Sequence, residues 1–156
     1  MKRGKSRIST GLLVLALLSG CATSTKAPDG FEIEPASTEQ PRVLPDSGTN
    51  KAALRLLTQA QQAAQAGQLD VAEARLERAL RIEPRNAALW YYMAKLRLHQ
   101  GQYSQAAGLA AKSNSLDKGD RILQADNWRI IAHARYQNGD IAGAQRAQQK
   151  AAELAE

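Results

Sequence analysis

Few residues of this 156-residue chain have types and spacings that could perform chemistry. There is one cysteine, Cys21, and there are two histidines, His99 and His133. Each histidine has a cation four residues before it, Lys95 or Arg129, and a cation is the wrong neighbour for a metal ligand. No glycine-rich phosphate loop, nucleophile elbow or zinc motif occurs. We therefore predict no catalytic residue, no metal site and no cofactor.

The single cysteine follows a segment with the features of a secretory signal peptide. Four basic residues lie between Lys2 and Arg7, an unbroken apolar run extends from Leu12 to Leu18, and small residues precede Cys21. This pattern predicts a signal peptide over residues 1–20. The run is too short for a transmembrane helix, which needs about 20 apolar residues. A lone cysteine cannot form an internal disulfide, so acylation explains the thiol better than redox or nucleophilic chemistry.

The four residues Leu18-Ser19-Gly20-Cys21 resemble the lipobox of bacterial lipoproteins. The resemblance implies cleavage before Cys21 and lipid attachment to its sulfur and to the new amino terminus. Ala22 follows where an aspartate would retain the protein at the inner membrane. The family's sorting rule therefore implies an outer-membrane anchor with the domain facing the periplasm. A plain secretory signal with a coincidental cysteine is the alternative.

Charge is unevenly distributed along the chain. The net charge is +6, but four of the 21 basic residues lie within residues 1–20, which leaves 17 against 15 acidic residues. A nucleic-acid binder needs its basic excess in the folded domain, so we expect no nucleic-acid partner. Residues 22–50 carry a net charge of −3 and residues 51–156 a net charge of +5.

Residues 21–50 are predicted to form a disordered linker that starts at the lipidated cysteine. Four of the five prolines lie here, and no helical or strand periodicity is present. Such a segment cannot bury enough apolar surface to offset its loss of entropy on ordering. As a flexible coil, its 29 residues after Cys21 would span about 30 Å on average. It would hold a domain away from a membrane, although a linker with no selected length is equally compatible.

From Lys51 onward, apolar residues recur at spacings of three and four, which predicts amphipathic helices. Gly67, Gly101 and Gly139 each follow a long helical stretch, where a left-handed helix end favours glycine. They stand 34 and 38 residues apart, which indicates a repeat. The expected helices cover 51–66, 69–82, 87–100, 103–116, 121–138 and 141–155. The four extra residues of the second step are assigned to Asp117–Asp120, lengthening either that turn or the next helix.

The repeat resembles the tetratricopeptide repeat. The residues that carry the resemblance include Trp90, Ala94, Gly101, Tyr103, Ala106 and Ala110, with Trp128, Ala132, Gly139 and Ala144 at matching places. The resemblance implies an all-α solenoid of helical hairpins, about three repeats long, over residues 51–156. Alanines would let paired helices approach closely while Trp90, Tyr103 and Trp128 fill the space between layers. The first repeat departs from the pattern by having Leu56 at the tryptophan position.

In that family the first helix of each repeat lines a concave groove. The resemblance therefore implies a partner-binding groove formed by Tyr91, Lys95, Leu98, His99, Arg129, His133, Tyr136 and Gln137. Aromatic and cationic side chains together suit a peptide, particularly an acidic one. A solvated groove wall with no dedicated ligand is the alternative. Arg75, Arg78, Arg81 and Arg85 form a second basic face, which we interpret as a solvated outer surface rather than an anionic-polymer site.

These observations favour a non-enzymatic lipoprotein that binds a periplasmic protein. The order of lipid, spacer and small repeat domain is similar to that of outer-membrane lipoprotein activators of class A penicillin-binding proteins, which are bifunctional peptidoglycan synthases. A pilotin or assembly factor for a secretin or pilus complex is one alternative, and a structural envelope lipoprotein is another. A glycan hydrolase would need acidic residues converging in a cleft, and no such set is marked out.

Overall fold

The computed structural model describes residues 48–156. The predicted signal peptide, the predicted lipidation site Cys21 and the predicted linker up to residue 47 lie outside the described residues. Within 48–156, no helix has both the length and the apolar character needed to cross a membrane.

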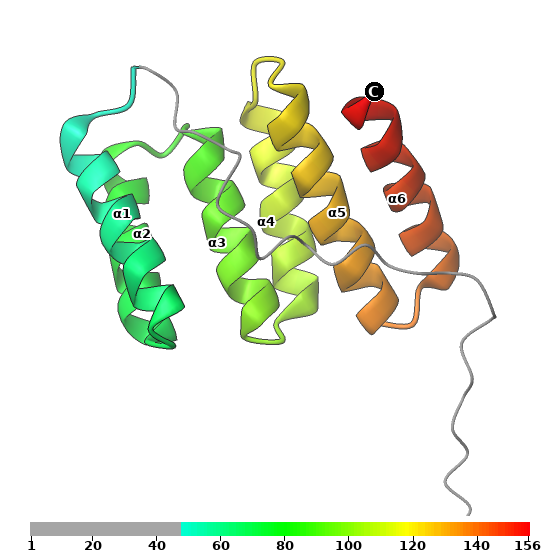
Figure 1. The fold of residues 1–156 in the computed structure, drawn as a ribbon, viewed down its shortest axis with the longest axis horizontal. Helices are drawn as coiled ribbons and strands as arrows, with labels where there is room; N and C mark the ends of the chain where they lie inside the picture. Colours follow the sequence, from blue (N-terminus) through cyan, green and yellow to red (C-terminus); the bar gives the residue numbers. More distant parts are fainter. Residues whose placement is uncertain (1–47) are drawn as a thin grey trace, which may run out of the picture. The chain divides into compact units, whose positions relative to one another are not determined.

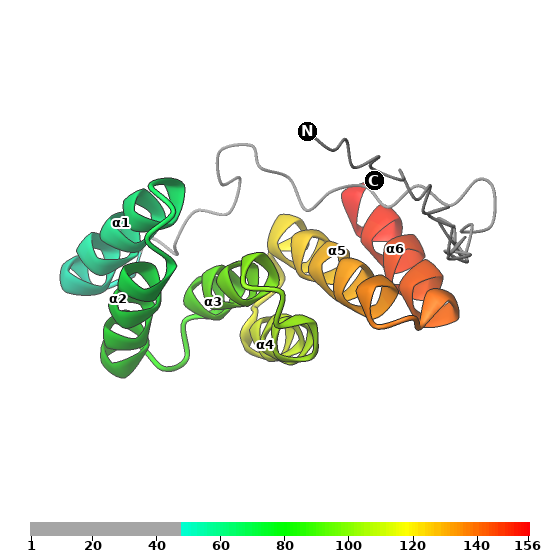
Figure 2. The same ribbon diagram turned by 90° about the horizontal axis from the view of Figure 1, so that it is seen from below.

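Six α-helices and no strands make up residues 48–156, which confirms the all-α prediction (Figure 1). Each expected helix is present, and the bounds differ from the expected ones by no more than one residue. Helices consecutive in sequence pack as hairpins, and α1, α3 and α5 lie on one side of α2 and α4 (Figure 2). The helices are α1 (Lys51–Gln65), α2 (Leu69–Ile82), α3 (Ala87–His99), α4 (Tyr103–Leu116), α5 (Arg121–Gln137) and α6 (Ile141–Ala155).

Each hairpin turn closes on a glycine in the left-handed region, as predicted. Gly67, Gly101 and Gly139 have φ of 73°, 71° and 81°. In the first turn the N–H of Gln68 donates to the carbonyl of Ala63 at 2.9 Å, and the other two turns repeat this bond. The motif satisfies helix-end carbonyls that would otherwise lack a donor. The glycine spacing therefore sets the position of every hairpin.

The four extra residues of the second repeat lie in a helix. The turns before α3 and before α5 both contain four residues, whereas α5 has 17 residues and α3 has 13. The insertion thus lengthens α5 by one turn at its start. The assignment of the extra residues to Asp117–Asp120 was therefore wrong, and of the two alternatives the longer helix is confirmed. Arg121 in that turn donates to the carbonyls of Leu154 and Glu153 at the end of α6, at 3.2 and 3.0 Å.

Alanines occupy the helix interfaces, as expected from the repeat. Six of the interface alanines are at most 1% exposed: Ala72, Ala79, Ala94, Ala106, Ala132 and Ala144. The three aromatic residues expected between the layers, Trp90, Tyr103 and Trp128, are half-buried instead of enclosed. Each ring therefore contacts the core on one side and lies partly at the surface.

A buried polar chain joins α3, α4 and α5. The hydroxyl of Ser113 donates to the carbonyl of Ala87 at 2.8 Å, and the Asn127 amide donates to the Ser113 hydroxyl at 2.8 Å. Both side chains are fully enclosed. Buried polar groups are tolerated when hydrogen-bonded, and these bonds specify how α5 sits against the second hairpin.

Candidate functional site: a groove along α3 and α5

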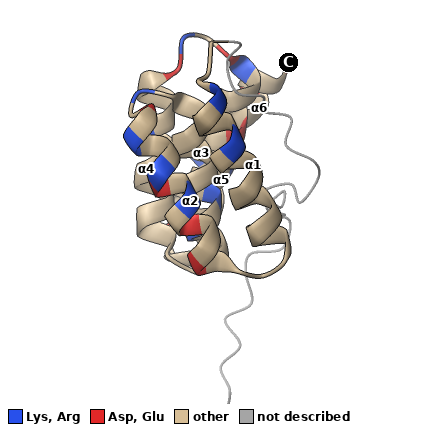
Figure 3. Ribbon diagram, turned by 90° about the vertical axis from the view of Figure 1, so that its left-hand side faces the viewer, with Lys and Arg blue, Asp and Glu red and all other residues tan. Residues whose placement is uncertain are grey.

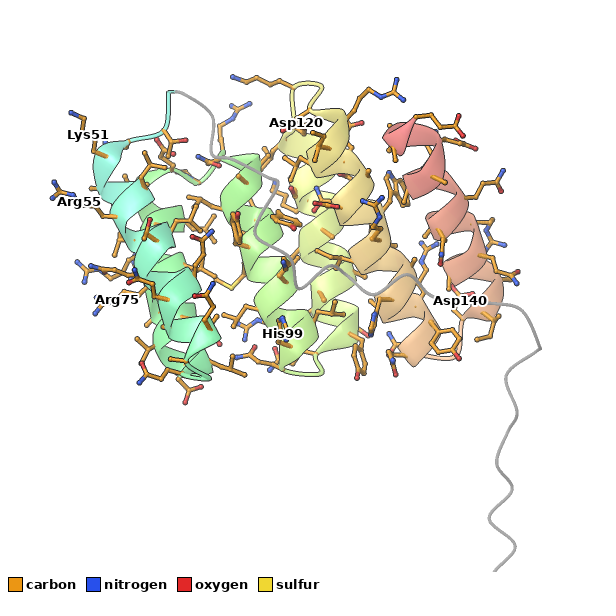
Figure 4. The ribbon with its side chains drawn as sticks, viewed as in Figure 1. Lys51, Arg55, Arg75, His99, Asp120 and Asp140 are labelled. Atoms are coloured by element: carbon orange, nitrogen blue, oxygen red, sulfur yellow. The ribbon has the colours of Figure 1, made fainter. Side chains whose placement is uncertain are left out.

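The eight predicted groove residues lie on two neighbouring helices. Tyr91, Lys95, Leu98 and His99 belong to α3, and Arg129, His133, Tyr136 and Gln137 belong to α5. Their exposure varies widely, because Tyr91 is buried whereas His99 and Gln137 are exposed. His99 lies at the end of α3, next to the turn that leads into α4 (Figure 4).

Tyr91 forms the link between the two helices. Its hydroxyl lies 3.5 Å from a carboxylate oxygen of Asp126 on α5, and that carboxylate also forms an ion pair with Arg129 at 2.7 Å. The ammonium of Lys95 lies 5.7 Å from the centre of the Tyr91 ring, within cation–π range. Three of the predicted residues therefore meet in one cluster on α3 and α5.

Burial sets the protonation of this cluster. Burial raises the pKa of Tyr91 well above its ordinary value, and the negative charge of Asp126 raises it further. Burial also lowers the pKa of Lys95, while Asp126 opposes that shift. Tyr91 is therefore a neutral hydrogen-bond donor at physiological pH, and its hydroxyl is directed at Asp126.

Asp126 is the groove residue that the sequence reasoning missed. The interpretation of the groove as aromatic and cationic placed no carboxylate among its members. Its spacing in the sequence could have identified it. Asp126 stands three residues before Arg129, which places both on one face of a helix, and 35 residues after Tyr91. Its charge offsets that of Arg129, so this part of the groove is less basic than the sequence indicated.

Tyr92 continues the buried aromatic contact of Tyr91 toward α1. Its ring lies edge-on to that of Tyr91, with centroids 5.0 Å apart and planes at 66°. Burial raises the pKa of Tyr92 to about 12, although a hydrogen bond with Gln61 on α1 opposes the shift. Tyr92 is not among the predicted groove residues, because the repeat resemblance placed Tyr91 there and not its neighbour.

A second group lies further along α5. His133 stacks on Tyr103 of α4, with centroids 6.5 Å apart and planes at 29°, and its Nε2 lies 3.4 Å from the Gln137 amide nitrogen. Burial lowers the pKa of His133, so the imidazole is neutral at physiological pH. Leu98 packs against the core at the edge of the groove.

Neither group has the composition of a metal site or a catalytic dyad. Among residues 48–156, no three histidine, cysteine, aspartate or glutamate side chains lie close enough to share a metal ion. The arrangement offers aromatic faces, hydrogen-bond donors and one paired carboxylate, which are the elements of a protein-binding surface.

The second basic face lies on α2 and in the turn that follows it. Arg78, Arg81 and Arg85 are exposed and Arg75 is half-buried. Figure 3 shows acidic and basic residues interspersed along this part of the molecule, and Arg75 projects outward in Figure 4. Mixed charges of this kind agree with a solvated outer surface better than with an anionic-polymer site.

Comparison with known proteins agrees with the repeat fold. A family model described as tetratricopeptide repeat matches residues 63–125. The solved globular C-terminal domain of P. aeruginosa LpoP is 45% identical, covers 65% of this chain and 96% of that domain, and superposes with a TM-score of 0.63. The chain belongs to the LpoP family of tetratricopeptide-repeat proteins.

A more distant structure shares the repeat fold of this LpoP-family chain. The N-terminal domain of stress-induced protein-1 (STI-1) from C. elegans is 14% identical, covers 71% of this chain and 100% of that domain, and has a TM-score of 0.60. At that identity the likeness concerns the fold alone. The sequence has no significant match among curated proteins.

Proposed function

We propose that the chain is a non-enzymatic outer-membrane lipoprotein that binds a class A penicillin-binding protein in the periplasm and activates its glycan polymerisation. The observation that carries the proposal is the 45% identity to the LpoP domain across 96% of that domain. The order of lipobox, spacer and small repeat domain adds support, because it is similar to that of lipoprotein activators of these synthases. The tetratricopeptide repeat supports a protein-binding role.

We propose the groove along α3 and α5 as the contact surface. The bond between Tyr91 and Asp126 spans the two helices, so the surface is held in one arrangement before the partner arrives. Preorganisation of this kind reduces the entropy cost of binding. The half-buried ring of Tyr136 on α5 adds apolar area beside the polar groups.

The anchor and the spacer fit the same proposal. A lipid on Cys21 would fix the chain to the outer membrane, and the acidic, proline-bearing segment up to residue 47 would set the distance over which the domain can reach. Cys21→Ser should release the protein from the outer membrane and leave the repeat domain folded. Full cellular activity of that variant would contradict a role for the anchor.

The proposed function is tested by adding the purified full chain, in detergent micelles, to a class A penicillin-binding protein from the same cell and measuring glycan polymerisation. We expect a higher polymerisation rate and a measurable dissociation constant. No change in rate would contradict activation. Recovery of only secretin or pilus components after cross-linking in intact cells would favour the alternative assembly role.

Substitutions in the groove test whether the partner protein binds along α3 and α5. Arg129→Gln removes the groove cation, and Arg146→Gln removes an exposed cation on α6 as a matched control. We expect Arg129→Gln to weaken partner binding about fivefold or more, as for a modest interface hot spot, and Arg146→Gln to leave it unchanged. Equal affinities of the two variants would move the interface away from the groove.

A further inference from the structure

A cavity of about 660 Å³ lies between α2, α3 and α4. We call it the α2–α4 pocket. Trp90 and Met93 of α3 line its floor, and Leu80 of α2 and Leu109 of α4 line its two sides. The α3 residues that face it occupy a different face of that helix from the groove residues. The α2–α4 pocket is therefore separate from the surface proposed above.

The aromatic floor of the pocket is held in position. The indole Nε1 of Trp90 donates a hydrogen bond to the carbonyl of Pro84 at 2.8 Å, and Pro84 itself lines the pocket. The indole is half-buried, whereas Met93 beneath it is buried. A fixed and partly exposed aromatic ring beside apolar walls is a preformed site for a large apolar side chain.

Gly108 in the wall of the pocket is exposed and has open space where a side chain would stand. It lies in the middle of α4, its φ is not positive, and a Cβ added there would meet no atom within 4 Å. Glycine in the middle of a helix stabilises that helix less than alanine would. It is found where another backbone approaches closely. The missing side chain leaves the pocket open on the α4 side.

The charges around the pocket are distributed unevenly. Arg81 lies exposed on its rim, and Arg85 follows in the turn after α2. Arg97 also lines the pocket, but it is already paired with Glu73. The acidic rim residue, Glu77, is one turn further toward the start of α2. The end of the pocket near the α2–α3 turn therefore favours a carboxylate.

We propose that the α2–α4 pocket binds a partner-protein segment that inserts one large apolar side chain over Trp90 and places an adjacent carboxylate beside Arg81. The apolar floor and walls select the anchor residue, and Arg81 sets the direction of the segment. The site is additional to the groove and does not depend on the identity of the groove's partner.

The proposal is tested with random 12-residue peptides displayed on phage and selected on the purified full chain in detergent micelles. Enriched peptides should carry a large apolar residue within two positions of an aspartate or glutamate. Synthetic copies should quench the fluorescence of Trp90 in a Trp128→Phe background. Gly108→Leu should weaken their binding about tenfold or more, because the new side chain takes the place of the anchor. Ala111→Leu adds the same side chain at an exposed α4 position outside the pocket, and it should leave binding unchanged.

Charge reversal tests the orientation of the segment. Arg81→Glu should weaken the acidic peptides about fivefold, and changing the peptide carboxylate to lysine should restore affinity for that variant. Circular dichroism melting curves identify any variant that is misfolded.

Three results would overturn the proposal. One is the absence of any enriched peptide that depends on Gly108. Another is a severalfold gain in peptide affinity when residues 22–47 are removed, since the chain's own segment would then be the occupant. The third is self-association that Gly108→Leu abolishes, which would make a second copy of the chain the occupant.

Discussion

The guanidinium of Arg97 on α3 donates two hydrogen bonds to the carboxylate of Glu73 on α2, at 2.7 and 2.5 Å. Gln100 donates a third bond to the same carboxylate at 3.1 Å. The contact between α2 and α3 is less extensive than the equivalent contact between α4 and α5. The paired charges therefore connect the first hairpin to the second where apolar packing contributes least.

Removing the charge of Glu73 should loosen that connection. Glu73→Gln should lower the free energy of unfolding by about 1–2 kcal/mol, because a two-pronged, charge-assisted pair is lost from a largely covered site. Urea unfolding followed by circular dichroism measures the change. Glu77→Gln, one turn along on the exposed side of α2, should change it by less than about 0.5 kcal/mol. Equal effects of the two variants would contradict a specific bridge.

The same pair should make stability depend on pH. The hydrogen bonds from Arg97 and Gln100 hold the pKa of Glu73 below its ordinary value of 4.5. A depressed carboxyl pKa stabilises the folded state above the unfolded pKa, and this contribution disappears as pH falls through the folded pKa. The difference in unfolding free energy between wild type and Glu73→Gln should thus be full at pH 6–7 and decrease below about pH 4.5. A constant difference down to pH 3 would contradict the assignment.

Arg121 should protect the end of α6. Its guanidinium donates to the last carbonyls of that helix, where a cation also interacts favourably with the helix dipole. Arg121→Ala should lower unfolding free energy by about 0.5–1 kcal/mol and speed amide hydrogen exchange in the final turn of α6. Lys118→Ala, an exposed cation in the preceding turn, is the control and should affect neither. Unchanged exchange in α6 after Arg121→Ala would show that the contact contributes nothing.

Two glycines should respond oppositely to alanine. Gly108 lies in a helix with open space around its Cα, so Gly108→Ala should stabilise the domain by about 0.5–1 kcal/mol. Gly101 has φ of 71°, so Gly101→Ala should destabilise it by about 1 kcal/mol or more. Thermal melting of both variants shows whether each substitution raises or lowers the melting temperature. A lower melting temperature for Gly108→Ala would contradict the open space found at this position.

The helices could be predicted from the sequence because their signals are local. Apolar spacing, the glycines at 67, 101 and 139, and cap residues such as Asn50 and Asp120 all act within a few positions along the chain. Backbone bonds of a helix join residues four apart, so nearby residue types are sufficient to place its ends. The repeat spacing then indicated which helices pair and which two lie side by side along the groove.

The contents of the groove and the pocket depended on contacts between distant residues. The bond from Tyr91 to Asp126 joins positions 35 apart, and the pair Glu73–Arg97 joins positions 24 apart. Whether the four extra residues lengthen a turn or a helix is also decided by packing, because Arg121 gains partners only when α5 begins there. The sequence by itself determined the six helices and their order. Only the tertiary structure determined which charges neutralise one another and where the surface stays open, since both depend on the orientation of side chains from separate helices.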